Sequence, residues 1–122
     1  MEYTELKVWK ETRSLVSNVY GIIKGFPKEE LYGLINQMRR CAISIPSNIA
    51  EGCGRRTPKD SIQFFHISRG SLYELETQLY LTLDQNYVQV NEHKELSDQI
   101  INCKKLLNGF INYYNTLNSK NH

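Results

Sequence analysis

The chain has 122 residues, of which 40% are hydrophobic and 23% are charged, and its formal net charge at pH 7 is +2. These values exclude wholesale disorder and predict one globular domain around a single core. No apolar run approaches ~20 residues and the N-terminus lacks a signal-peptide pattern, so we expect a cytoplasmic protein without a membrane partner.

The first half of the chain is predicted to form two helices, because its apolar residues recur every three or four positions. Thr4 is the expected N-cap of a helix over residues 5–24, whose stripe contains Val8, Thr12, Leu15, Val19 and Ile22 or Ile23. Pro27 suits the first turn of a second helix over residues 28–52. Its stripe contains Leu31, Leu34 or Ile35, Met38, Cys41 or Ala42, Ile45 and Ile49.

The second half is also predicted to be helical. In "TPKD", Thr57 is the expected cap, Pro58 the first helical residue and Asp60 the acidic residue of a start similar to a capping box. This helix over residues 58–84 has a stripe of Phe65, Ser68, Leu72, Leu75, Leu79 and Leu83. After the turn "DQNYVQVN", Asn91 is the expected cap of a helix over residues 92–118, with a stripe of Leu96, Ile100, Cys103, Leu107, Phe110, Tyr114 and Leu117.

Four helices joined by short connections predict an all-α fold, an up-down-up-down antiparallel four-helix bundle. The third helix is thin at Ser68, Gly70 and Ser71, which permits the close approach of another helix, either in the same chain or in another subunit. Trp9 is expected to anchor packing beside the first helix, whereas Tyr3 is placed near a helix end and suits either packing or stacking on a base.

The stretch "SIPSNIAEGCGRRTPKDS", residues 44–61, allows two interpretations. A phosphate-binding loop requires G-x-x-x-x-G-K-[ST] after a strand, and this stretch lacks that spacing, the lysine and the strand. The other interpretation is a helix that bends or loosens at Pro46, because proline has no N–H and clashes with the carbonyl of Ala42. Gly52 or Gly54 then ends the helix in a left-handed conformation. The second interpretation is favoured.

Three runs of the sequence, "LKVW", "FPKEELYGLINQMRRCAISIPSNIAEGCGR" and "SLYELETQLYLTLDQNYV", strongly resemble one bacterial family. Its members are four-helix-bundle proteins encoded within intervening sequences of 23S ribosomal RNA genes, and the accessory variability protein of diversity-generating retroelements is similar to them. The resemblance covers almost the whole chain. It implies a ring-like homopentamer that binds nucleic acid through basic surface and, in the retroelement branch, associates with a reverse transcriptase. It implies no established activity.

The charges of the predicted bundle separate by end. Residues 1–13, 51–69 and 104–122 share one end and carry ten Lys or Arg against five Asp or Glu, a net charge of +5, whereas residues 20–39 and 74–98 share the other end and carry −4. A ring would repeat the basic end five times, and affinity for nucleic acid rises with the number of phosphates neutralised. The basic residues named for this end are Arg55, Arg56, Lys59, Lys104 and Lys105. Charged helix ends are also common in proteins that bind no nucleic acid.

No group of residues in the sequence is typical of an enzyme site. A di-iron bundle needs Glu-x-x-His pairs, and none occurs. His66 and His93 are predicted to lie at opposite ends of the bundle, and His122 is terminal. The three cysteines are far apart and form no C-x-x-C pair of the kind that binds zinc: Cys41, Cys53 and Cys103. We therefore expect no catalytic residue, no metal and no cofactor.

Two functions remain from the sequence. The first is a non-enzymatic helical bundle that binds RNA or DNA through a basic surface, with the contacts Arg55, Arg56 and Lys59 and the further candidates Arg39, Arg40 and Arg69. Glu51 is expected either to pair with Arg55, four residues on, or to stay against a neighbouring helix or subunit. The alternative function is a protein-interaction adaptor that docks a larger enzyme, such as a reverse transcriptase.

Overall fold

The structure is a computed structural model that describes residues 2–120. These residues form four α-helices and no β-strand, in agreement with the predicted all-α class. The helices are α1 (Lys7–Ile23), α2 (Asn36–Cys53), α3 (Pro58–Asp84) and α4 (Val90–Lys120). Short helical segments precede α1 and α2: η1 (Tyr3–Glu5), η2 (Lys28–Glu30) and η3 (Leu31–Ile35).

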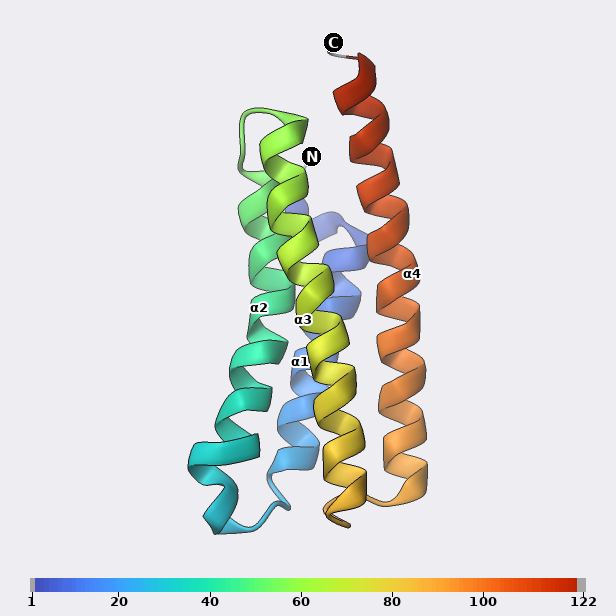
Figure 1. The fold of residues 1–122 in the computed structure, drawn as a ribbon. Helices are drawn as coiled ribbons and strands as arrows, with labels where there is room; N and C mark the ends of the chain where they lie inside the picture. Colours follow the sequence, from blue (N-terminus) through green and yellow to red (C-terminus); the bar gives the residue numbers. More distant parts are fainter. Residues whose placement is uncertain (1, 121–122) are drawn as a thin grey trace.

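The four helices run alternately in opposite directions (Figure 1). α1 packs against α2 and α4, and α3 packs against the same two helices from the other side. The α2–α3 turn and the C-terminal end of α4 therefore lie at one end of the molecule, while the α1–α2 and α3–α4 connections lie at the other. This arrangement brings residues 2–13, 51–69 and 104–120, the described parts of the predicted basic end, toward the same end of the bundle.

Each helix buries one apolar stripe. Thr12, the polar member of the α1 stripe, is fully buried, and its Oγ1 donates a hydrogen bond to the Trp9 carbonyl at 3.0 Å. The α4 stripe departs at its end from the predicted stripe, whose residues alternate in steps of four and three, because Ile111 is buried and Phe110 is half-buried against Phe65. The reason is that an ideal helix has 3.6 residues per turn and drifts away from a strict 3.5-residue repeat.

The predicted cap of α3 is present, since Thr57 Oγ1 accepts a hydrogen bond from the Asp60 N–H at 3.2 Å. The other two predicted caps are wrong. Thr4 lies inside η1, and α1 begins only after the extended residue Leu6, whose side chain packs against the core. At the start of α4, Asn91 already lies within the helix.

The second helical region begins at residue 28, as expected, but its start is irregular. Residues 28–30 form a 3₁₀ turn and residues 31–35 a wide π turn, so regular α-helix begins at Asn36. Gly33 has φ −107° and ψ −115°, outside the helical region. A Cβ on Gly33 would lie 2.7 Å from Glu30 Oε1, the atom that accepts a hydrogen bond from the Leu34 N–H. Glycine permits this backbone conformation, and the lack of a Cβ leaves space for the Glu30 carboxylate beside the Leu34 N–H.

Small side chains line the contact between α2 and α3. Ser68 Oγ donates a hydrogen bond to the Ile45 carbonyl at 2.8 Å, and the hydroxyls of Ser44 and Ser71 lie 2.6 Å apart. These contacts agree with the prediction that a thin α3 permits close approach of another helix, and they assign part of that surface to packing within the chain. Gly70 differs, because it is exposed and has open space around it.

The end of α2 corrects the prediction of a left-handed glycine. α2 continues through Pro46 to Cys53, Gly54 has φ −85°, and no glycine among residues 2–120 has positive φ. Gly52 does not end the helix by a left-handed conformation; it is buried against α3. A Cβ at this position would collide with the Phe65 ring and lie 2.9 Å from the Ser61 carbonyl oxygen. Close helix packing, rather than the turn, requires this glycine.

Candidate nucleic-acid interface

The α2–α3 turn holds three of the predicted contact residues at one end of the bundle. Arg55 and Arg56 follow the end of α2, and Lys59 is the second residue of α3. Thr57 and Pro58 begin α3 sharply, because the threonine caps the helix and proline needs no N–H partner at this position. The local sequence therefore places three cations beside a helix N-terminus, which carries partial positive charge of its own.

Arg55 is the least available of the three cations. Its guanidinium Nη2 lies 2.7 Å from Glu51 Oε2, which confirms one of the two predicted arrangements for Glu51. The same guanidinium lies over the Phe64 ring, 4.4 Å from the ring centroid. An exposed ion pair of this kind contributes little to stability. It does neutralise charge that a phosphate would otherwise meet.

Arg56 and Lys59 are exposed, and neither forms an ion pair or a side-chain hydrogen bond with any residue between 2 and 120. Both side chains can turn toward a ligand without first breaking a contact within the described part of the chain. These two residues are the free cations of the turn.

Arg69 and Lys104 lie on the outer seam between α3 and α4, away from the turn. Arg69 donates a hydrogen bond to Asn108 Oδ1 at 3.2 Å and follows Pro58 by about 17 Å of helix. Lys104 Nζ lies 2.8 Å from Glu76 Oε1, still further along α3, and 4.0 Å from the centroid of the Tyr73 ring. The prediction that Lys104 belongs to the basic end is wrong, because the register of α4 against α3 pairs it with a carboxylate.

Arg39 and Arg40 lie in the other half of α2, more than about 20 Å of helix before Arg55. Arg39 is half-buried with its guanidinium 5.7 Å from the centroid of the Tyr20 ring on α1. Arg40 is exposed and lines a polar hollow between α2 and α3 that also contains Glu74. The six predicted contact residues therefore do not form one surface. Only the three at the turn lie together.

Two of the three cysteines are deeply buried, and burial raises the pKa of both Cys41 and Cys103 to about 12. Cys41 Sγ also donates a hydrogen bond to the Ser71 carbonyl at 3.1 Å. Cys53 is half-buried, and burial raises the pKa of its thiol. Since only the thiolate is a good nucleophile, these environments disfavour thiol chemistry.

Of the three histidines weighed in the sequence, His122 lies outside the described residues.

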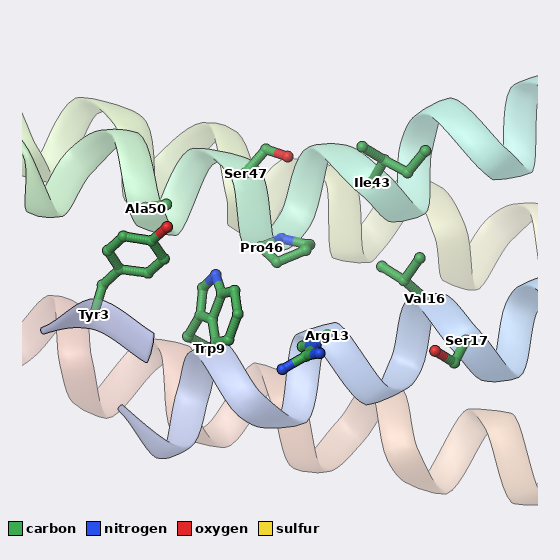
Figure 2. A pocket seen from close by; sticks show the side chains of 9 residues that line it. All are labelled: Tyr3, Trp9, Arg13, Val16, Ser17, Ile43, Pro46, Ser47 and Ala50. Atoms are coloured by element: carbon green, nitrogen blue, oxygen red, sulfur yellow. The ribbon is translucent and has the colours of Figure 1, made fainter. Parts of the chain in front are cut away.

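A groove between α1 and α2 was not predicted as a site (Figure 2). It has a volume of about 350 Å³ and is lined by Tyr3, Trp9, Arg13, Val16, Ser17, Ile43, Pro46, Ser47 and Ala50. The Trp9 ring stands between the two helices, with Tyr3 on one side and Arg13 on the other. The ring centroids of Tyr3 and Trp9 are 5.3 Å apart, and the Arg13 guanidinium carbon lies 5.5 Å from the Trp9 centroid.

One local signal in the sequence could have indicated this groove. Trp9 and Arg13 are four residues apart on one helix, so their side chains share a face. The residues on α2 lie more than thirty positions further along the chain, and only the packing of the two helices brings them opposite Trp9.

None of the described helices combines the length and the apolar character needed to cross a membrane. A family model described as 23S rRNA-intervening sequence protein matches residues 4–109 of the chain. No curated protein matches it. Among solved structures, it is similar to the 1.70 Å crystal structure of a protein of unknown function from the S23 ribosomal protein family of Bacteroides thetaiotaomicron. The two are 20% identical with a TM-score of 0.79, over 85% of this chain and 97% of that chain, which shows a shared fold.

Proposed function

The chain belongs to the family of 23S rRNA-intervening sequence proteins, and we propose that it is a non-enzymatic bundle that binds RNA or DNA through the basic end at the α2–α3 turn. The observation that carries this proposal is the pair of free cations there. Arg56 and Lys59 are exposed beside the start of α3, with no carboxylate paired to either within residues 2–120. Phosphate oxygens are suitable partners, because they accept hydrogen bonds from both side-chain types and from helix N-termini.

One bundle offers few such contacts, so assembly matters to the proposal. We propose the ring-like homopentamer that the family resemblance implies, in which five turns present their cations together. The outer face of α3 and α4 supports self-association, since Tyr73, Tyr80 and Ile101 are 52%, 54% and 44% exposed. Covering exposed apolar groups of this size with another copy of the chain is favourable, because it removes apolar surface from water. Linked sites also bind more tightly than any one of them alone.

The test of this proposal is a salt titration of binding to labelled single-stranded RNA, single-stranded DNA and duplex DNA. The variant carries both Arg56→Glu and Lys59→Glu. The slope of log affinity against log salt is expected to become shallower by about 1.4 for each engaged subunit on a single strand, because two phosphate contacts are lost.

The matched control carries Lys24→Glu and Lys28→Glu, which make the same change in net charge at the opposite end of the bundle. Both control residues are exposed, and neither forms an ion pair within residues 2–120. Equal effects of the two double variants would mean that only overall charge matters and would contradict an interface at the turn. Absence of binding by the unmodified protein would favour the alternative function, an adaptor that docks a larger enzyme such as a reverse transcriptase.

A further inference from the structure

We propose that the groove between α1 and α2 is a second binding site, which takes a proline-rich segment of a partner protein followed by acidic residues. This proposal is independent of the nucleic-acid interface. The free cations Arg56 and Lys59 do not line the groove, which has its own chemistry (Figure 2).

The groove has an apolar wall that no other part of residues 2–120 covers. Ile43 is 43% exposed and Tyr3 is 37% exposed, while Pro46 presents its ring from the middle of α2 toward Trp9. Aromatic and proline rings of this kind pack well against the rings of another proline-rich chain, which is how aromatic-lined grooves recognise extended peptides.

The polar groups of the groove have no hydrogen-bond partners within the described residues. The indole N–H of Trp9, the Arg13 guanidinium and the hydroxyls of Tyr3, Ser17 and Ser47 make no hydrogen bond with any residue between 2 and 120. Two of these groups, the indole and the guanidinium, can only donate. A ligand rich in acceptors is therefore a suitable partner for the groove.

A proline-rich segment meets that need better than a helix does. In the polyproline II conformation the backbone carbonyls have no internal partners, and proline brings no N–H that would be left unpaired. An α-helix has already used nearly all of its carbonyls. The ligand is also preorganised, so little conformational entropy is lost on binding.

The charge of the groove sets the flanking residues of the ligand. Arg13 is the only charged residue that lines the first hollow, and Glu51, the carboxylate of the adjoining hollow, is already paired with Arg55. One unpaired cation beside an apolar wall suits an acidic side chain next to the prolines. A nucleic acid is less suitable here, because its affinity depends on several neutralised phosphates.

The length of the groove fits a short segment. A second hollow shares Tyr3, Ser47 and Ala50 with the first and continues along α2 to Gly54. The ion-paired side chains of Glu51 and Arg55 line this second hollow. From Ile43 to Gly54 the helix rises about 17 Å, which corresponds to about five residues of polyproline II at 3.1 Å each.

The experiment uses Trp9 as the probe, since it is the protein's only tryptophan. The full chain is titrated with a decaproline peptide that ends in two aspartates. A second peptide keeps the aspartates and the length but replaces the prolines by Gly-Ser repeats. We expect a saturable shift of Trp9 emission with the proline peptide, and binding of the Gly-Ser peptide weaker by about tenfold or more, because the flexible chain loses more conformational entropy.

The variant Arg13→Glu leaves Trp9 in place. It is expected to weaken binding of the proline peptide by about tenfold or more, because the new carboxylate then faces the aspartates of the peptide. Its control is Lys10→Glu, the same charge change on an exposed residue of α1 that does not line the groove. The control is expected to bind as the unmodified protein does.

Four binding results would overturn the proposal. They are no saturable shift with the proline peptide, an equal response to both peptides, an equal loss in the two variants, and a Trp9 shift with an oligonucleotide instead of a peptide. A fall in solution mass on Arg13→Glu would also overturn it, because a second copy of the chain would then be the occupant of the groove.

Discussion

Gly52 and Gly70 are glycines of two adjacent helices whose surroundings differ. Gly52 is buried, and an added Cβ would collide with the Phe65 ring, whose Cδ1 would lie 2.8 Å away. Phe65 itself is fully buried and packs against Phe110 and Tyr114, so it has little room to move. Around Gly70, by contrast, no side chain or neighbouring element lies within 4 Å of the Cβ position apart from its own stretch of helix.

We predict opposite effects of the same substitution at these two positions. Gly52→Ala is expected to destabilise the protein by about 1–3 kcal/mol, because it overpacks the contact between α2 and α3. Gly70→Ala is expected to stabilise it by about 0.5–1 kcal/mol, because alanine favours the helix and meets no neighbour. Urea denaturation of both variants measures the difference, and a Gly52→Ala protein as stable as Gly70→Ala would disprove the close contact.

At the scale of the element, α2 and α3 begin in different ways. α3 has a sharp start in which Thr57 caps the helix and Pro58 occupies its first position. The second helix instead passes through a 3₁₀ turn and a π turn before regular helix begins. Tyr87, from the α3–α4 connection, donates a hydrogen bond to Glu30 Oε2 at 2.9 Å, so the irregular start is held by a contact that is distant in sequence.

The cap of α3 gives a prediction at this scale. Thr57→Ala is expected to lower the free energy of unfolding by about 1 kcal/mol, because the Asp60 N–H loses its acceptor. Thr77→Ala is the control. Thr77 is exposed within α3, and its hydroxyl bonds only back to the Tyr73 carbonyl, so alanine is expected to be neutral or slightly stabilising there. Thermal unfolding of the two variants measures the difference between them. Equal losses of stability would contradict a role for the cap.

At the scale of the whole molecule, the outer seam between α3 and α4 combines exposed aromatic rings with contacts that hold them. Lys104 lies over Tyr73, and His93 packs beside Tyr80 with ring centroids 4.9 Å apart. Ile101 lies on α4 three residues before Lys104 and is 44% exposed. Such a surface suits contact with another copy of the chain, whereas the cations of the α2–α3 turn stay free at the end.

The assembly is tested by light scattering at micromolar concentration. We predict a mass of about five times the chain mass of 14.3 kDa. Ile101→Glu is expected to reduce that mass, because it places a charge within the proposed contact between copies. Asn102→Glu is the control, since it adds the same side chain at the next exposed position of α4. A monomeric unmodified protein would contradict the ring and the avidity that it supplies.

Much of the fold follows from the sequence because it depends on interactions between residues close together in the chain. The 3.6-residue period of apolar residues predicts the helices, short connections predict their alternating direction, and Thr57 and Pro58 mark the start of α3. The pair of Glu51 and Arg55 belongs to the same class, since residues four apart share a helix face. The same local sequence places Arg56 and Lys59 at the turn between α2 and α3.

The tertiary structure decided everything that depends on the register of one helix against another. It paired Lys104 with Glu76 and placed Gly52 against Phe65. It also made the groove, whose two walls come from different helices that are distant in sequence. The physical reason is that periodicity shows which face of a helix is buried. How far each helix slides along its neighbour is set by the packing of particular side chains, which a single helix does not contain.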